Sequence, residues 1–315
     1  MKIIFMGTPD FAAKALDALC EAGHEVVLVV TQPDKPKGRS GKLAPSPVKE
    51  IALERQLPLF QPVKIREEDS IKRIEDVQAD IAVVAAFGQL LPERLLGIPT
   101  YGCVNIHASL LPKYRGASPI QQAIADGEKV TGITLMQMDV GMDTGDILMQ
   151  EQVEIAPEDT AGTLFDKLAD RGAALIVKAL PLIEQGALTP VKQDPALATK
   201  CGKISKEAGR IDWTKNVADI VNHIRAYTPW PAAYCLHEGR MMKILQAEAL
   251  IQGTENVTVD YLPGTVLRAD KKGIEIGCKD GSVRILKLQP EGKKPMDAAG
   301  FLNGHKLTAG TLFSD

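Results

Sequence analysis

The sequence predicts an α/β fold in which a doubly wound, mainly parallel sheet is followed by a smaller antiparallel β-barrel domain. Residues 2–6 form an apolar strand pattern that leads, through helical spacing over 11–22, into a second strand at 25–30. This strand–helix–strand order is typical of parallel sheets covered by helices. After residue 231 the pattern changes to short strands separated by glycine turns, which is typical of small antiparallel barrels.

The first domain is Rossmann-like in its expected topology. Buried-type strands are predicted at 81–87 and 103–107, and strands at 131–138 and 147–155 flank an acidic loop. Residues 158–186 have the spacing of one or two helices that close the domain. The first turn, Gly7-Thr8-Pro9-Asp10, lacks the glycines of a dinucleotide-binding fingerprint, so a nicotinamide or flavin dinucleotide is disfavoured.

The second domain begins with a helix pattern over 216–227 and the tripeptide Pro229-Trp230-Pro231. Its expected strands are 233–236, 242–249, 264–269, 273–277 and 282–289. Residues 200–315 hold 17 Lys and Arg against 13 Asp and Glu, a net charge of +4, so the rest of the chain carries −7. This asymmetry suggests a polyanionic partner for the C-terminal half, although a solvated basic face is the commoner explanation.

The composition is that of an ordinary globular protein, with 45% hydrophobic and 24% charged residues among 315. This length favours two domains. The sequence contains no run of eighteen apolar residues, so a membrane span is not expected. The five cysteines and five histidines are dispersed, so we expect free thiols and no metal site. The first residues have the pattern of a core strand rather than of a targeting segment, and a bacterial-type cytoplasmic location is therefore expected.

The candidate catalytic residues lie at the end of the strand over 103–107. Asn105 and His107 are two residues apart, so both side chains project from one face of this strand. An amide donor beside an imidazole suits a developing oxyanion and a proton transfer. The loop over 138–146 offers a carboxylate partner, but spacing alone does not choose between Asp139 and Asp143. The pattern predicts acyl transfer or hydrolysis at a small carbonyl.

The motif Asn105-x-His107-x-Ser109-Leu110-Leu111-Pro112, with Asp143 downstream, resembles the 10-formyltetrahydrofolate-dependent formyltransferases. The resemblance extends from the opening Lys2–Phe11 segment to Leu288–Lys294. Within the family, the chain most resembles the members that act on initiator methionyl-tRNA. It implies transfer of a formyl group from 10-formyltetrahydrofolate, the cosubstrate, to the methionine amino group on that tRNA. It also implies an OB-like C-terminal barrel.

The resemblance assigns the catalytic roles to Asn105, His107 and Asp143. Ser109 lacks the surroundings of a nucleophile, and it is expected to have a positioning role. The positions implied to hold the folate come from three segments of the chain: Phe87, Gly88, Gln89, Leu90, Leu91, Ser109, Leu110, Leu111, Pro112, Asp139, Val140 and Gly141.

The segment over 31–49 contains five basic residues, one acid and four prolines, with little apolar content. Such a long connection is either a solvated loop or a functional arm. We expect it to contact the phosphates of tRNA through Lys35, Lys37, Arg39 and Lys42, and the resemblance favours Arg39. Two residues of the interdomain connection, Lys203 and Lys206, are further candidates for phosphate contacts.

The expected domain limits are 1–189 for the catalytic, folate-binding domain, 190–206 for a linker and 207–315 for the barrel, which contributes to tRNA binding. The protein is expected to be a monomer. Three alternatives stay open: a formyltransferase for an amino sugar nucleotide or other small amine, a 10-formyltetrahydrofolate hydrolase, and a tRNA-binding protein without catalysis. The basic arm and the barrel argue against the first, and an intact Asn105, His107 and Asp143 set argues against the last.

Overall fold

The computed structural model describes residues 1–37, 41–250 and 261–313. The chain folds into two compact units, which are described separately. The first comprises Met1–Pro119, Val130–Glu154 and Phe165–Cys201. The second comprises Ile120–Lys129, Ile155–Leu164 and Gly202–Asp315. The domain limits expected from the sequence, near residues 189 and 206, stay a prediction.

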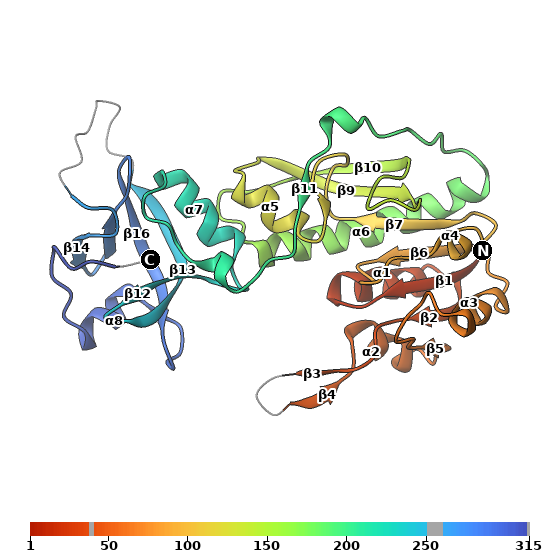
Figure 1. The fold of residues 1–315 in the computed structure, drawn as a ribbon, viewed down its shortest axis with the longest axis horizontal. Coiled ribbons are helices and arrows are strands. Elements are labelled where there is room, and N and C mark those ends of the chain that lie inside the picture. Colours follow the sequence, from red (N-terminus) through yellow and green to blue (C-terminus); the bar gives the residue numbers. More distant parts are fainter. Residues whose placement is uncertain (38–40, 251–260, 314–315) are drawn as a thin grey trace. The chain divides into compact units, whose positions relative to one another are not determined.

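A seven-stranded sheet forms the centre of the first unit, in the order β10-β9-β7-β6-β1-β2-β5 (Figure 1). Its strands are β1 (Lys2–Gly7), β2 (Glu25–Val30), β5 (Leu59–Phe60), β6 (Ile81–Ala85), β7 (Cys103–His107), β9 (Val130–Gln137) and β10 (Ile147–Glu154). The five strands from β7 to β5 pair in parallel, whereas β9 is antiparallel to both β7 and β10. The predicted α/β fold with a mainly parallel sheet is therefore confirmed.

Helices cover both faces of this sheet. They are α1 (Asp10–Glu21), α2 (Pro47–Glu54), α3 (Glu68–Glu75), α4 (Glu93–Leu96) and the long α6 (Ala161–Glu184). Gly172 of α6 packs so closely on Ile106 of β7 and Ile133 of β9 that a Cβ atom would meet both side chains. The face of β7 opposite Ile106, which carries Asn105 and His107, is therefore free of α6 and open to loops.

The carboxyl ends of β1, β2, β6 and β7 lie at one edge of the sheet, because these strands run parallel. Gly7 ends β1, and a Cβ atom there would meet Ala12 and the carbonyl oxygen of Ala85. Glycine thus allows α1 to start directly against the sheet. This edge is where ligands bind in open α/β folds.

The described parts of the basic segment after β2 form a strand pair and specific polar contacts. Strand β3 (Lys35–Lys37) pairs antiparallel with β4 (Lys42–Ala44), and Lys35 lies opposite Ala44. At its base Lys49 forms an ion pair of 2.7 Å with Asp34, which also accepts a 2.8 Å hydrogen bond from Gln61. These hydrogen bonds hold the pKa of the Asp34 carboxyl below its usual value. The ends of the arm are thus fixed to the domain.

The second unit contains an antiparallel sheet in the order β12-β13-β16-β15-β14, with β17 paired to β16. Its elements are α5 (Pro119–Ala125), whose first residue belongs to the first unit, α7 (Val217–Ala226), β12 (Ala233–His237), β13 (Arg240–Leu250), β14 (Val266–Asp270), β15 (Gly273–Gly277), β16 (Ser282–Pro290), β17 (Met296–Asp297) and α8 (Ala298–Gly304). Trp213, Phe301 and Phe313 are buried in its core. The antiparallel second domain is confirmed; within the described residues, the strand path from β12 to β14 does not close on itself.

Candidate active site

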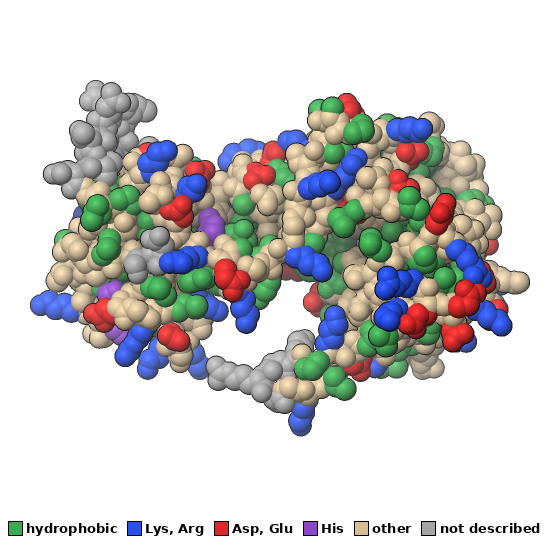
Figure 2. Space-filling model, in the orientation of Figure 1, with side chains coloured by type: hydrophobic (Ala, Val, Ile, Leu, Met, Phe, Trp, Pro, Cys, Tyr) green, Lys and Arg blue, Asp and Glu red, His purple; other side chains and the backbone are tan. Residues whose placement is uncertain are grey.

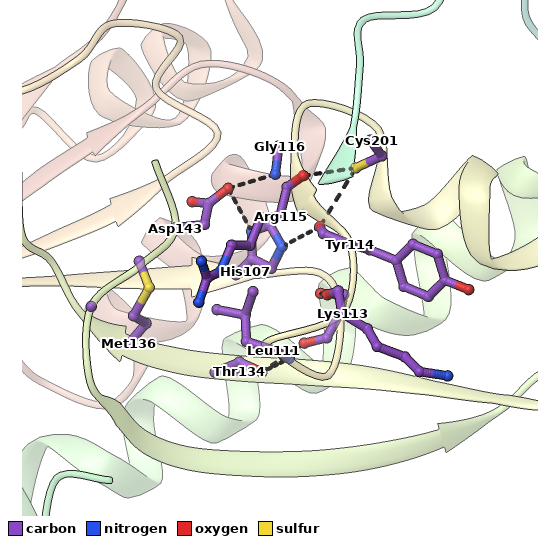
Figure 3. A network of polar contacts seen from close by, with 12 residues as sticks. His107, Leu111, Lys113, Tyr114, Arg115, Gly116, Thr134, Met136, Asp143 and Cys201 are labelled. Atoms are coloured by element: carbon purple, nitrogen blue, oxygen red, sulfur yellow. Dashed lines mark hydrogen bonds and ion pairs between the residues drawn. The ribbon is translucent and has the colours of Figure 1, made fainter. Parts of the chain in front are cut away.

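His107 is the last residue of β7 and is buried, with 6% of its surface exposed. Its Nε2 atom lies 3.0 Å from the carbonyl oxygen of Tyr114 (Figure 3). Because a carbonyl oxygen only accepts, Nε2 carries the proton of this hydrogen bond. The other ring nitrogen, Nδ1, faces the Oδ2 atom of Asp143 at 3.8 Å. This distance is too long for a hydrogen bond, so Nδ1 is the ring nitrogen left for chemistry.

Asp143 is held in place by its backbone and by one strong contact. Its φ angle of 54° lies in the left-handed region, where Asp is tolerated better than most residues. The Gly116 N–H donates a 2.7 Å hydrogen bond to Oδ2. This main-chain donor keeps the carboxylate turned toward His107.

The loop that carries Asp143 runs along β7 from its start to its end. Since β9 is antiparallel to β7, the loop leaves the sheet beside Cys103, whose carbonyl accepts a 2.8 Å hydrogen bond from Met138. It returns to place Asp143 beside His107. Asp139, in contrast, accepts hydrogen bonds from Gly141 and Thr144 within the loop, at 3.0 Å and 2.7 Å. The structure therefore brings Asp143 to the imidazole and uses Asp139 to shape the turn.

Asn105 and His107 share the face of β7 opposite Ile106, as the sequence spacing predicts. It lies opposite Met136 of β9 and is half-buried. In the part of the chain that the structure describes, its side chain makes no hydrogen bond. Its amide is therefore available to a ligand oxygen beside His107.

The turn after β7 is fixed by buried polar contacts. Ser109 is fully buried, and its hydroxyl donates a 2.7 Å hydrogen bond to the carbonyl oxygen of Lys113. Thr134 of β9 donates a 2.6 Å hydrogen bond to the Ser109 carbonyl. It accepts a 3.0 Å hydrogen bond from the Leu111 N–H (Figure 3). The Ser109 hydroxyl is thus bonded within the protein, as a positioning role requires. Of the remaining positions in this turn, Leu111 is buried, whereas Leu110 and Pro112 are half-buried.

The segment after β6 lies at the same sheet edge. The carbonyl oxygen of Phe87 accepts hydrogen bonds from the side chains of Thr8 and Gln32, at 3.1 Å and 3.2 Å. The side chain of Gln89 accepts a 2.7 Å hydrogen bond from the Ile65 N–H. Gly88 has a φ angle of 85°, a conformation that favours glycine. These contacts fix the path of the loop that the resemblance assigns to folate binding.

Three large apolar side chains on the two candidate folate loops stay in solvent. Leu90 is 72% exposed, and Val140 and Met142 are 71% and 60% exposed. The backbone of Gly141 passes so close to Thr144 that a side chain at this position would overlap its hydroxyl. In the space-filling view, hydrophobic side chains lie recessed in the viewed face of the first unit, with Lys and Arg side chains around them (Figure 2). Apolar groups with neighbouring main-chain donors suit a planar heterocycle.

Gln193, in the segment expected to be a linker, was not singled out from the sequence. It is buried, and its amide oxygen accepts two hydrogen bonds from Arg115, at 3.0 Å and 2.8 Å. Its amide nitrogen donates to the carbonyl oxygens of Asp143 and Gly145, at 2.9 Å and 2.7 Å. A single glutamine in a connection carries no sequence signal, so only the structure shows this link.

The connection that carries Gln193 also pairs with the turn that contacts His107. Strand β11 (Lys200–Cys201) pairs in parallel with β8 (Arg115–Gly116). Gly116 has a φ angle of 119°, and a Cβ atom there would overlap the carbonyl oxygen of Cys201. Glycine is thus required for the Gly116 N–H to reach Asp143.

The candidate tRNA-contacting residues lie in both units. Lys35, Lys37 and Lys42 belong to β3 and β4 of the first unit, whereas Arg39 lies outside the described residues. Lys203 and Lys206 are exposed in the second unit. Their role in RNA binding stays a prediction.

No helix in the described ranges has the length and apolar character needed to cross a bilayer. No group of three or more His, Cys, Asp or Glu side chains there is arranged to hold a metal ion.

Known protein families match both the N-terminal and the C-terminal part of the chain. Residues 1–180 match a family model described as formyl transferase, and residues 203–306 match one described as formyl transferase, C-terminal domain. A solved N-formyltransferase structure from Helicobacter canadensis, in complex with folinic acid and dTDP-3-aminofucose, is 19% identical, with a TM-score of 0.68. That match covers 90% of this chain and 98% of the other, and it shows a shared fold.

Two curated relatives are more similar in sequence. The methionyl-tRNA formyltransferase of Lachnospira eligens is 46% identical over 315 residues, which is 100% of both chains. That of Agathobacter rectalis is 46% identical over 314 residues and also covers 100% of both chains. The chain belongs to the methionyl-tRNA formyltransferase family.

Proposed function

We propose that this protein transfers the formyl group of 10-formyltetrahydrofolate to the methionine amino group of initiator methionyl-tRNA. The observation that carries the proposal is the meeting of Asn105, His107 and Asp143 at one strand end in a chain 46% identical, over its full length, to two methionyl-tRNA formyltransferases. The reaction joins an amine to a formyl carbon and needs no covalent bond to the enzyme.

The three side chains have complementary roles in the proposed mechanism. Attack of the amine places negative charge on the formyl oxygen, which the Asn105 amide stabilises by donating a hydrogen bond. His107 is oriented by its Nε2–H bond to Tyr114, so an N–H at Nδ1 would be the second donor. The Asp143 carboxylate, whose Oδ2 atom lies 3.8 Å from Nδ1, accepts the proton of the amine through water. That proton passes to N10 of the folate as the bond between N10 and the formyl carbon breaks, which releases tetrahydrofolate.

The folate binds, in this proposal, between the loop over 87–91 and the loop over 139–143, beside the turn over 109–112. The exposed side chains of Leu90, Val140 and Met142 offer apolar contact, and the loops offer main-chain donors and acceptors. The Helicobacter canadensis relative of this fold was solved with folinic acid, a formylated folate.

The tRNA is proposed to contact both units. The candidates in the first unit are Lys35 and Lys37 of β3, Lys42 of β4, and Arg39. In the second unit the candidates are Lys203 and Lys206, which are exposed. We further expect the protein to act as a monomer in the cytoplasm.

One experiment separates this function from the alternatives. The full-length protein is incubated with donor carrying a labelled formyl group and, in separate reactions, with charged initiator tRNA, an amino sugar nucleotide, or buffer alone. Label on the methionine of the tRNA supports the proposal. Label on the sugar amine, or release of formate at the same rate without any acceptor, would contradict it.

A further inference from the structure

A pocket of about 270 Å³ lies at the carboxyl ends of β1 and β2, where the basic arm leaves the domain and returns to it. None of the residues assigned above to catalysis or to folate binding lines it. Five of its lining residues are prolines: Pro9, Pro33, Pro36, Pro45 and Pro47. Proline rings offer flat apolar surfaces on a backbone whose φ angle is already fixed, so the pocket has little conformational freedom to lose on binding.

Contacts beneath the pocket hold its walls. Ser46 accepts a hydrogen bond from the Lys49 N–H at the start of α2, and its hydroxyl lies 2.8 Å from that of Thr31. Asp34, beside the lining residues Pro33 and Lys35, forms the 2.7 Å ion pair with Lys49. The pocket is therefore preformed in the protein without a ligand.

Two residues of the pocket wall also hold one of the candidate folate loops. Two of its lining residues, Thr8 and Gln32, donate to the carbonyl oxygen of Phe87. The rim also carries Asp10, an acceptor, and Lys35, a cation. An apolar slot with one acceptor and one cation at its edge suits a heterocyclic base that is attached to a phosphate.

The strand order decides which part of the acceptor reaches the pocket. From β7 the sheet continues to β6, β1 and β2, so the pocket is two to three strand spacings, about 10–14 Å, from His107. In methionine the thioether is four bonds from the amine, a reach of at most about 6 Å. In an aminoacyl-adenosine the base begins seven bonds from the amine, a reach of about 10 Å, and extends further.

We propose that this proline-lined pocket binds the unpaired base at the 3′ end of the tRNA while the attached amino acid lies at His107. The inference rests on the function proposed above and adds to it the group that positions the acceptor. Stacking of one base on an aromatic side chain changes affinity by roughly ten- to a hundredfold, and we take the same range for the flat proline rings of this pocket. The pocket thus favours acceptors that carry the terminal nucleoside over free methionine esters.

The test compares 3′-O-methionyl-adenosine with methionine methyl ester as acceptors, with charged initiator tRNA in a third reaction. The pocket is filled by Ala44→Phe and, more mildly, by Ala44→Leu, because Ala44 lines it. The matched control is Leu43→Phe, since Leu43 is the neighbouring residue of β4, is 69% exposed and does not line the pocket. Thermal melting of each variant reports whether it is folded.

For the wild type, kcat/KM should be roughly ten- to a hundredfold higher with methionyl-adenosine than with the ester. Both Ala44 variants should reduce this ratio, Ala44→Phe to near one, while Leu43→Phe keeps it. A ratio near one in the wild type that formylates charged tRNA would overturn this inference alone, as would an unchanged ratio in a folded Ala44 variant. A raised KM for the folate in the Ala44 variants would instead assign the pocket to the donor, and failure to formylate charged tRNA would overturn the proposed function itself.

Discussion

The amide nitrogen of Gln193 lies 2.9 Å from the carbonyl oxygen of Asp143, fifty positions earlier in the chain. The same side chain accepts two hydrogen bonds from Arg115, which belongs to the turn that contacts His107. Gln193 therefore joins the two loops that carry and orient the candidate acid–base pair. It is a positioning residue, because it touches these loops rather than the reacting atoms.

Replacing Gln193 by methionine keeps its length but removes all of these hydrogen bonds. We expect kcat to fall by about a hundredfold, since displacement of a catalytic group by about 1 Å has effects of that size, while the KM for the folate changes little. Steady-state kinetics with charged tRNA measures both. Gln185→Met, at an exposed position of the first unit, is the matched control. A Gln193→Met enzyme that stays folded and keeps wild-type kcat would contradict the role.

Two aspartates of one loop provide a second comparison. Asp143→Asn removes the charge beside His107 and should lower kcat by about a hundred- to ten-thousandfold, the usual contribution of acid–base groups. Asp139→Asn keeps an acceptor for Gly141 and Thr144 and should have a much smaller effect. Single-turnover rates with saturating donor would distinguish these outcomes. Equal losses in the two variants would show that the carboxylates act only by shaping the loop.

The stability of the second unit should depend on pH through His223 of α7. Burial lowers the pKa of His223 below its usual 6.5, and its Nε2 atom has no hydrogen-bond partner among the described residues. The unfolded state therefore binds more protons than the folded state at acid pH, so stability is full above about 6.5 and falls as the pH drops below it. We expect His223→Phe, which keeps the ring contact with Tyr227, to show a weaker fall of Tm between pH 7 and 5. Parallel curves for both proteins would refute this assignment.

The cysteines should differ in their reaction with thiol reagents. Burial raises the pKa of the Cys103, Cys235 and Cys278 thiols to about 12, so almost no thiolate forms at pH 8. Cys201 is buried as well, whereas Cys20 is half-buried in α1. Brief iodoacetamide treatment followed by peptide mass spectrometry should find label on Cys20 first. Label on Cys103 in the folded protein would indicate that β7 opens more readily than its burial implies.

The local spacing of apolar residues was sufficient to predict most helices and strands of the fold. The helix expected over 11–22 is observed as Asp10–Glu21, and the strand expected at 25–30 is Glu25–Val30. These assignments succeed because apolar spacing reflects burial on one helix face or on both faces of a strand. The strand pairing within the basic arm was not predicted, because the pairing of β3 with β4 depends on contacts across a turn rather than on periodicity.

The α/β architecture follows from the order of apolar segments, and the shared face of Asn105 and His107 follows from the alternation of side-chain direction along a strand. The choice of Asp143 over Asp139, the contact of His107 Nε2 with Tyr114 and the approach of Gln193 to the loop became visible in the folded chain. These contacts join segments that are far apart in the chain. Their distances depend on how β9 pairs with β7 and how the connection over 190–201 packs, and no local spacing encodes either.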